Sequence, residues 1–176
     1  MDFAHYIGGN WVADSDVTTN RNPANQDDVI GTYARGGAGR VDEAVAAAMA
    51  AQDDWAHASP QLRHDVLERA GALIVARKDE IGRLLAREEG KTLAEAVGET
   101  LRASQVFKFF AGEALRNTGD AIASVRPGVE VMIEREPVGV IGLITPWNFP
   151  IAIPAWKLAP GPALGNPVVM KPAELT

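Results

Sequence analysis

The first forty residues carry short apolar segments separated by residues typical of turns. Apolar pairs at 6–7 and 11–12 flank Gly-Gly-Asn at 8–10, residues that tolerate positive φ, and this pattern predicts a β-hairpin. Asn-Pro-Ala-Asn at 22–25 predicts a turn, and residues 29–34 predict another short strand.

The middle of the chain has apolar residues at helical spacing, beginning with a predicted helix over 41–55. Ser59-Pro60 predicts the start of a second helix, because a hydroxyl caps free backbone amides and proline suits the first helical position. A third helix is expected from Asp79 to Gly90, and the capping-box pattern T-x-x-E at 92–95 predicts a long fourth helix. The apolar face of this fourth helix is predicted to carry Leu93, Val97, Leu101, Ser104, Phe107, Ala111 and Leu115.

The pattern changes to that of strands after a predicted turn at 117–120. Residues 129–134 alternate between apolar and mostly acidic positions, which is typical of a half-exposed strand. Residues 138–144 are apolar without alternation, as in a strand covered on both faces. Residues 151–164 predict a crossover helix and 168–170 the next strand, and such a βαβ unit implies an α/β fold with a parallel sheet.

Composition narrows the classes of partner. The net charge of −6 and the pI of about 5.1 are unlike the basic surface of a nucleic-acid binder, and they also disfavour docking on anionic lipids. The apolar stretch 138–170 is long enough to cross a bilayer, but its six prolines argue against a spanning helix. We therefore expect no nucleic-acid or membrane partner and a small-molecule substrate. Residues 1–5 lack the features of a secretory signal, which favours the cytoplasm.

Several kinds of chemistry are excluded or disfavoured by the residues present. The chain has no cysteine, so it holds no disulfide, no thiolate zinc site and no thiol nucleophile. The three histidines show no metal-ligand spacing, and no metal site is expected. The glycine-rich segment 36–39 is not followed by Lys-Ser/Thr, and we interpret it as a loop rather than a phosphate-binding site.

The most specific sequence is Thr-Pro-Trp-Asn-Phe-Pro at 145–150, at the carboxyl end of the apolar strand, where open α/β sheets bind ligands. It is followed by W-K-L-A-P at 156–160 and by G-N-P-V-V-M-K-P-A-E at 165–174. In this order the motifs closely resemble those of the NAD(P)-dependent aldehyde dehydrogenase superfamily. Further similar segments lie at 6–9, 22–24, 88–91 and 109–113, so the resemblance covers essentially the whole chain.

The resemblance implies an N-terminal fragment of an aldehyde dehydrogenase-like fold, with helices and the first βαβ unit of a Rossmann-like parallel sheet. Residues 1–121 would form the hairpin and helical part of the cofactor-binding domain, 122–137 a strand segment of the oligomerisation type, and 138–176 the truncated start of the NAD(P)-binding sheet. The complete enzyme would be a homo-oligomer that oxidises an aldehyde to a carboxylic acid. Segments 109–116 and 126–130 are similar to members that act on semialdehydes of dicarboxylic acids.

The family mechanism uses a cysteine thiolate to attack the aldehyde and a glutamate to activate the hydrolytic water. The cysteine is absent, so the chain alone is expected to be inactive. A non-catalytic nucleotide-binding or subunit-interaction module derived from the family is the alternative. By resemblance Asn148 donates to the oxyanion on the attacked carbonyl, a role that suits an amide because it does not titrate. Alternatively, Asn148 only caps the following helix.

The resemblance also assigns cofactor-binding residues at the ends of both strands. Thr145, Pro146 and Trp147 would line the cofactor cleft together with Asn148, although Trp147 could equally be a core aromatic. The second strand would hold the adenosine ribose through the segment Lys171, Pro172, Ala173 and Glu174. A carboxylate accepts hydrogen bonds from ribose hydroxyls and repels a 2′-phosphate, so NAD is favoured and NADP remains possible. Alternatively, Lys171 and Glu174 are ordinary solvated side chains that follow a strand.

Two features of the crossover segment stand apart. Lys157 resembles a lysine near the proton-release path of the family, or it extends to solvent as an isolated charge. The segment 160–163 is Pro-Gly-Pro-Ala where the family pattern has P-A-L-A. A second interior proline should cost about 3 kcal/mol unless the helix bends there.

Overall fold

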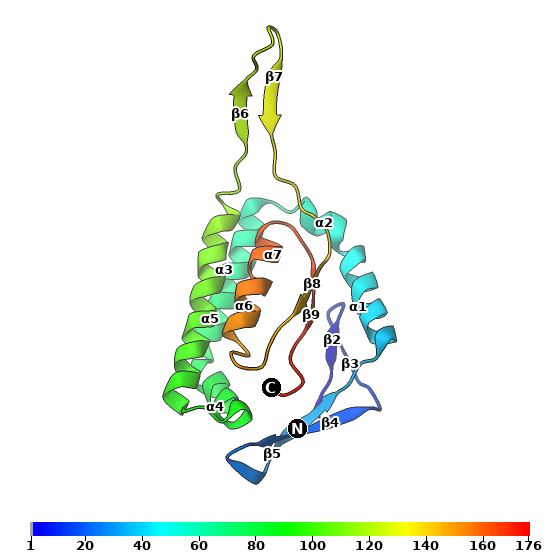
Figure 1. The fold of residues 1–176 in the computed structure, drawn as a ribbon, viewed down its shortest axis with the longest axis vertical. Helices are drawn as coiled ribbons and strands as arrows, with labels where there is room; N and C mark the ends of the chain where they lie inside the picture. The colour runs from blue at the N-terminus through cyan, green and yellow to red at the C-terminus, as the bar shows by residue number, and fades with distance from the viewer. Residues whose placement is uncertain (1) are drawn as a thin grey trace.

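The structure is a computed structural model that describes residues 2–176 (Figure 1). Its N-terminal part contains a three-stranded sheet of order β1-β5-β4, in which β1 is parallel and β4 antiparallel to β5. These strands are β1 (Asp2–Phe3), β4 (Val17–Asn22) and β5 (Asn25–Ala34). The turn predicted at 22–25 joins β4 to β5, but β4 itself was not predicted because it contains a single apolar residue.

The predicted N-terminal hairpin is confirmed. It consists of β2 (His5–Ile7) paired antiparallel with β3 (Asn10–Val12). Gly8 and Gly9 between the strands have φ of 56° and 82°, the left-handed region that a two-residue hairpin turn requires. Its ring pair, Tyr6 and Trp11, is tilted with centroids 4.8 Å apart.

The first helical segment differs from the prediction in two ways. It is divided into α1 (Ala38–Ala50) and α2 (Gln52–Ala56), separated at Ala51. The glycine-rich segment 36–39 is only partly a loop, because Gly37 is the N-cap of α1 and the helix has begun by Ala38. The Trp55 indole on α2 donates to the carbonyl of Pro162 at 3.1 Å, which ties this segment to the C-terminal unit.

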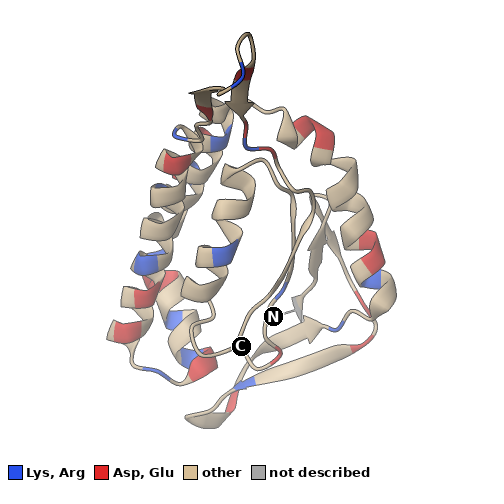
Figure 2. Ribbon diagram, turned by 45° about the horizontal axis from the view of Figure 1, so that its top comes forward, with Lys and Arg blue, Asp and Glu red and all other residues tan. Residues whose placement is uncertain are grey.

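The three long helices match the prediction at the ends that local signals marked. They are α3 (Pro60–Ala76), α4 (Lys78–Glu89) and α5 (Leu93–Ala114), which lie side by side on one flank of the molecule (Figure 1). The Ser59 hydroxyl accepts from the amide of Leu62, Gly90 ends α4 with φ of 84°, and the capping box at the start of α5 is present. Acidic and basic residues are interleaved along the outer helices (Figure 2).

The predicted apolar face of α5 is confirmed in its middle, where Ser104 and Ala111 are buried and Phe107 packs against the core, but it is wrong at both ends. Leu93 and Leu115 at its two ends are each 48% exposed. Because α5 contacts α3, α4 and α6, its buried positions are set by close helix approach, which favours small side chains. Those buried positions are Ala96, Glu99, Thr100, Ala103, Ser104, Val106, Ala111 and Ala114.

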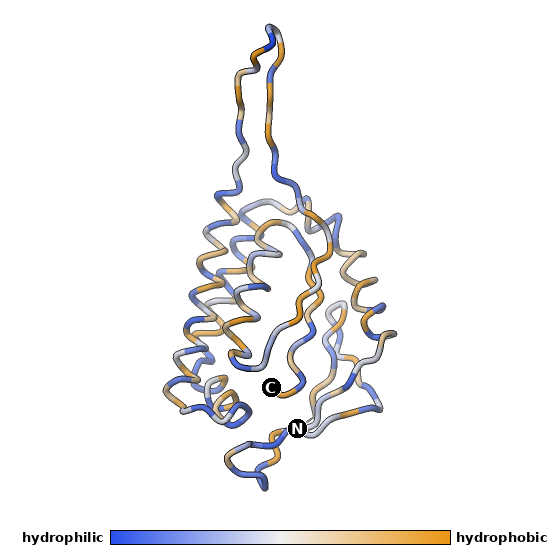
Figure 3. The backbone as a smooth tube through the Cα atoms, in the orientation of Figure 1, coloured by the Kyte–Doolittle hydropathy of each residue, from blue (hydrophilic) through white to orange (hydrophobic). Residues whose placement is uncertain are grey.

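A second hairpin extends away from the body of the molecule (Figure 1). It pairs β6 (Asp120–Ala123) antiparallel with β7 (Glu130–Ile133), and hydrophobic and hydrophilic positions mix along it (Figure 3). The predicted strand is present as β7, but the burial of one of its faces is wrong, because every residue of both strands is exposed. No element of residues 2–176 packs on either face, and the partner strand β6 was not predicted.

The predicted βαβ unit is confirmed. It consists of β8 (Ile141–Ile144), α6 (Ala152–Leu158), α7 (Pro160–Ala163) and β9 (Val168–Lys171). The two strands are parallel, with Ile144 opposite Lys171. The prediction that the first strand is covered on both faces is wrong for this chain. Leu143 is buried beneath α6, but Ile144 is 77% exposed. The strand also begins at Ile141 rather than Val138.

The Pro-Gly-Pro-Ala segment has a structural explanation. The crossover is interrupted at Ala159, so Pro160 and Pro162 both lie in the first turn of α7, where a missing N–H costs little. The cost expected of a second interior proline therefore does not apply. A Cβ added at Gly161 would lie 2.8 Å from Cγ2 of Val168, so this position accepts only glycine without a shift. The glycine therefore lets α7 approach β9 closely. Among residues 2–176, no helix is both long and apolar enough to cross a membrane.

Candidate functional site

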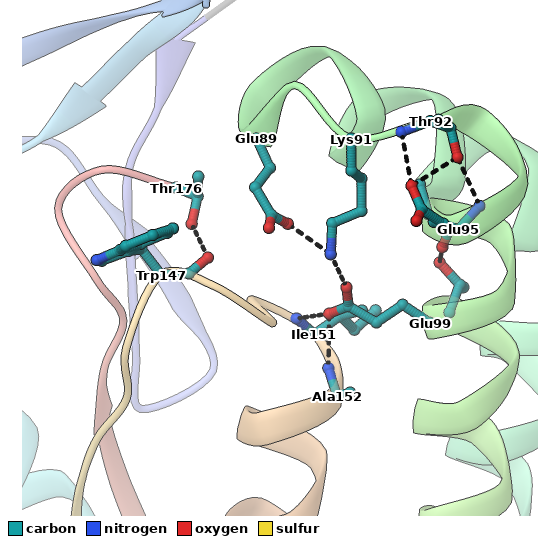
Figure 4. Close-up of polar contacts among 11 residues, drawn as sticks. Glu89, Lys91, Thr92, Glu95, Glu99, Trp147, Ile151, Ala152 and Thr176 are labelled. Carbon is teal, nitrogen blue, oxygen red and sulfur yellow. Dashed lines mark hydrogen bonds and ion pairs between the residues drawn. The ribbon is translucent and has the colours of Figure 1, made fainter.

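The predicted site residues lie at one edge of the β8–β9 sheet. Because Ile144 is opposite Lys171 in parallel strands, the segments 145–148 and 171–174 both leave the carboxyl edge, about 4.8 Å apart at the strand ends. A hydrogen bond joins the two segments further out, where the Thr176 hydroxyl donates to the carbonyl of Trp147 at 3.0 Å (Figure 4). The fold thus brings the two predicted groups of residues together.

The residues after β8 differ sharply in exposure. Thr145 is buried at 5% exposure, whereas Pro146 and Asn148 are exposed. Trp147 is 52% exposed, so the interpretation of this residue as a core aromatic is wrong. The segment therefore presents an indole and an amide at the surface of the described chain.

Lys171 and Glu174 form an ion pair of 2.5 Å after β9, and both side chains are exposed. The hydrogen bond from Lys171 lowers the pKa of Glu174, so this carboxyl is ionised at neutral pH. Pro172 is exposed and Ala173 half-buried between them. A carboxylate that accepts from hydroxyls, beside a lysine that donates, is a donor set that fits the ribose of a dinucleotide.

The N-terminus of α6 is capped from another helix. The amides of Ile151 and Ala152 donate to Oε1 of Glu99 on α5, at 3.0 and 3.1 Å. The amide of Ile153 donates to the carbonyl of Phe149 at 3.0 Å, and Pro154 has no N–H to satisfy. Every free donor of the first turn is thus accounted for without a side chain from the preceding loop.

The helix-capping interpretation of Asn148 is therefore wrong. No side chain of the loop caps α6, and the amides at the start of this helix donate to Glu99 instead. Within residues 2–176 the Asn148 side chain has no hydrogen-bond partner, so its donors stay available for a ligand. A free amide donor at this edge of the sheet fits the oxyanion role that the resemblance implies.

Glu99 is in turn paired with Lys91, which follows the end of α4. The Lys91 ammonium lies 2.5 Å from Oε2 of Glu99 and 2.7 Å from Oε2 of Glu89 (Figure 4). It also lies 4.7 Å from the ring centroid of Phe149, in the loop that carries Asn148. Burial alone would lower the pKa of Lys91, but its bonds to Glu89 and Glu99 outweigh burial and raise it.

The sequence interpretation missed both members of this pair. Lys91 belongs to the segment 88–91, which contributed to the resemblance but received no role. Glu99 follows Ala96 by three residues and precedes Ala103 by four, so it lies on the small-residue face of α5. A carboxylate on an otherwise buried face is a usable signal, because buried charges are almost always paired.

Lys157 is not part of this edge. It is exposed near the C-terminal end of α6 and lines a cavity of about 310 Å³ with Val138, Ile141 and Asn166, which lie near the amino ends of the strands. Asn166 is buried there, and its Oδ1 accepts from the amide of Gly139 at 3.0 Å. The structure thus separates Lys157 from Asn148 by the length of α6.

A second cavity of about 250 Å³ lies between α5 and α6. Trp156 and Phe109 line it and are 53% and 59% exposed. Arg102 lies beside them with its guanidinium 6.0 Å from the Trp156 ring centroid. It donates to Gln105 at 3.3 Å, and no carboxylate of residues 2–176 pairs with it. Within the same residues, no cluster of three potential metal ligands occurs.

Comparison with known proteins places this geometry in a family. Residues 11–176 match the aldehyde dehydrogenase family. The chain is 43% identical to α-ketoglutarate semialdehyde dehydrogenase of Haloferax volcanii, covering 97% of this chain and 36% of that protein. It is 40% identical to α-ketoglutaric semialdehyde dehydrogenase of Bacillus subtilis, covering 99% of this chain and 36% of that protein.

Solved structures agree with the sequence relatives. A point mutant of betaine aldehyde dehydrogenase from Staphylococcus aureus, in complex with NAD+, matches with a TM-score of 0.94 at 35% identity, over 98% of this chain and 36% of that one. The α/β fold is therefore that of the corresponding part of these enzymes, and the chain spans about a third of their length. The chain belongs to the aldehyde dehydrogenase family.

Proposed function

We propose that this chain supplies the oxyanion donor and one cofactor-binding edge of an enzyme that oxidises an aldehyde to a carboxylic acid with NAD(P)+. The observation that carries the proposal is the exposed, unpartnered amide of Asn148 at the carboxyl end of β8, in a loop fixed by neighbouring helices. When bound, the nicotinamide cofactor would accept the hydride. The role of this chain is to donate a hydrogen bond to the developing oxyanion and to orient the cofactor.

The test uses a chimeric enzyme in which residues 1–176 replace the matching segment of the Bacillus subtilis relative. Asn148→Ala should lower its kcat by roughly 10²–10³, the usual effect of losing one oxyanion donor. Asn117→Ala, an exposed asparagine outside the site, is the matched control. An unchanged kcat in Asn148→Ala, with chemistry shown to limit the rate, would refute the role.

NAD is the proposed cofactor, with NADP as the alternative. Support comes from the carboxylate of Glu174 at the end of β9, which would accept from ribose hydroxyls and repel a 2′-phosphate. Lys171 offsets part of that repulsion because it is paired with the same carboxylate. The preference is therefore expected to be moderate.

The proposed substrates are semialdehydes that carry a carboxylate. Both relatives described above are named for such a substrate. Arg102 adds support, because it is a guanidinium without an acidic partner among residues 2–176 and it lines the aromatic cavity between α5 and α6. In the chimera, Arg102→Leu should raise KM for an acidic semialdehyde more than for an uncharged aldehyde. Arg69→Leu, an exposed arginine on α3, should change neither, and equal effects on both substrates would count against a carboxylate-binding role.

A second candidate function is a subunit-interaction module without catalysis. It is favoured by the β6–β7 hairpin, where Ile122, Met132 and Ile133 are 50%, 72% and 45% exposed. In the complete enzyme the same hairpin would contact a second subunit of a homo-oligomer. Met132→Lys should weaken self-association measured by light scattering if the hairpin is such a contact, and an unchanged mass would argue against it.

A further inference from the structure

We propose that Glu99 and Lys91 are positioning residues that orient the Asn148 amide by fixing the loop 145–150 from outside. The inference rests on the proposed role of Asn148, and it assigns a function to a buried ion pair that lies on helical elements rather than in the loop.

The first support is the burial and full use of the Glu99 carboxylate. Its side chain is 3% exposed, and both oxygens are engaged, Oε1 by two backbone amides and Oε2 by Lys91. A negative charge at a helix N-terminus is favourable, and bonds from amides to a carboxylate are stronger than those to a neutral acceptor. The carboxylate therefore holds α6 at a defined position against α5.

The second support is the position of the loop between two fixed points. At one end, β8 is paired with β9 up to Ile144. At the other end, Ile151 and Ala152 are bonded to Glu99, only three and four residues after Asn148. Between them, the Phe149 ring lies under the Lys91 ammonium. The ion pair thus contacts the two residues that follow the loop (Figure 4) and, within the loop, the Phe149 ring next to Asn148.

The third support is that the loop has no cap of its own. Ile151 occupies the N-cap position of α6 and has no side chain able to accept a hydrogen bond. The acceptor comes instead from 52 residues earlier in the chain. Loss of the charge at Glu99 would leave the start of α6 with weaker acceptors and Lys91 with one partner fewer.

The test on the chain itself is hydrogen exchange followed by mass spectrometry, comparing Glu99→Gln with Glu113→Gln. Glu113 is a partly exposed glutamate on the same helix that pairs with Arg116. In Glu99→Gln, peptides covering 147–153 should exchange about tenfold faster, while peptides of α3 change less than about twofold. Lys91→Gln should show a smaller increase in the same peptides. Uniform acceleration throughout the chain, or no change in 147–153 in either variant, would overturn the proposal.

A double-mutant cycle in the chimeric enzyme separates positioning from stability. Glu99→Gln should lower kcat about tenfold with little change in KM, and it should add nothing in the Asn148→Ala background, because the donor it orients is already gone. An additive loss of kcat in the double variant would overturn the inference. If Asn148→Ala alone leaves kcat unchanged, the proposed function fails, and the exchange experiment still decides whether the pair fixes the loop.

Discussion

The core between helices α3 and α5 and the β8–β9 sheet of this chain differ in how completely their apolar residues are covered. In the helical layer Leu67, Ala111 and Ala114 are at most 2% exposed and pack with Ala163 of α7. In the sheet unit, Val138 and Ile144 are 86% and 77% exposed. The outer face of α3 also exposes apolar side chains, with Leu62 at 49% and Leu73 at 54%, so the difference lies in the core between the helices. That core is buried, whereas the sheet is covered mainly on one face, and Ala163 and the Glu99 contacts join the two.

The largest expected effect comes from a substitution in the core of the helical layer. Leu67→Ala removes a side chain that is 2% exposed and should lower the free energy of unfolding by about 2–5 kcal/mol. Ile144→Ala, at 77% exposure, should change it by less than about 0.5 kcal/mol. Urea denaturation followed by far-UV circular dichroism measures both. Equal decreases in the free energy of unfolding for the two variants would show that the two regions do not differ in the way described.

The next prediction concerns association of the exposed sheet. Two paired strands leave open edges and uncovered apolar area, so the purified chain is expected to self-associate while retaining helix. Ile144→Lys should shift the mass measured by size-exclusion chromatography with light scattering towards the monomer. A monodisperse wild-type monomer with strongly protected amides in 138–170 would contradict this prediction.

A smaller effect tests how the N-terminal strands are fastened to the helices. Asp28 on β5 accepts from Arg87 on α4 and from Asn22, and these bonds lower its pKa to about 2 from 3.8. A carboxyl whose pKa is depressed in the fold stabilises it above the unfolded value, and this stability is lost as pH falls from about 4 to about 2. Asp28→Asn should flatten the pH dependence of the melting temperature in that range. If the melting temperature of Asp28→Asn depended on pH as steeply as that of the wild type, the stabilising role of ionised Asp28 would be refuted.

The smallest expected effect concerns the cofactor edge. In the chimeric enzyme, Glu174→Ser should shift the ratio of kcat/KM values towards NADP, because the carboxylate that repels a 2′-phosphate is gone. The exposed Lys171–Glu174 pair makes the shift modest, since the freed lysine attracts a phosphate only through solvent. A ratio that is the same before and after the substitution would count against the ribose contact.

The sequence predicted those features whose causes lie within a few residues. Ser59, Gly90 and Thr92 set helix ends through bonds or dihedral angles that span at most four residues, and each was placed correctly. The βαβ unit followed from a change in period along 138–170. In contrast, β4 and β6 depend on pairing with β5 and β7 rather than on an apolar pattern of their own.

The candidate site was predictable in part for the same reason. The hexapeptide at 145–150 and the segment 171–174 are local motifs, and strand pairing brings them together. Glu99 could not be assigned from local pattern, because its partners Ile151 and Ala152 are more than fifty residues away. The exposure of Ile144 could not be predicted either, because the sequence pattern indicates that a strand is apolar but not which surfaces cover it.

The most direct test of the central claim compares the 176-residue chain with the chimera that joins it to the rest of the Bacillus subtilis relative. The assay is NADH formation with α-ketoglutaric semialdehyde. The account predicts turnover by the chimera, lowered in Asn148→Ala, and no turnover by the chain alone, which contains no cysteine. A folded chimera without activity, or turnover by the isolated chain that is lost in Asn148→Ala, would contradict it.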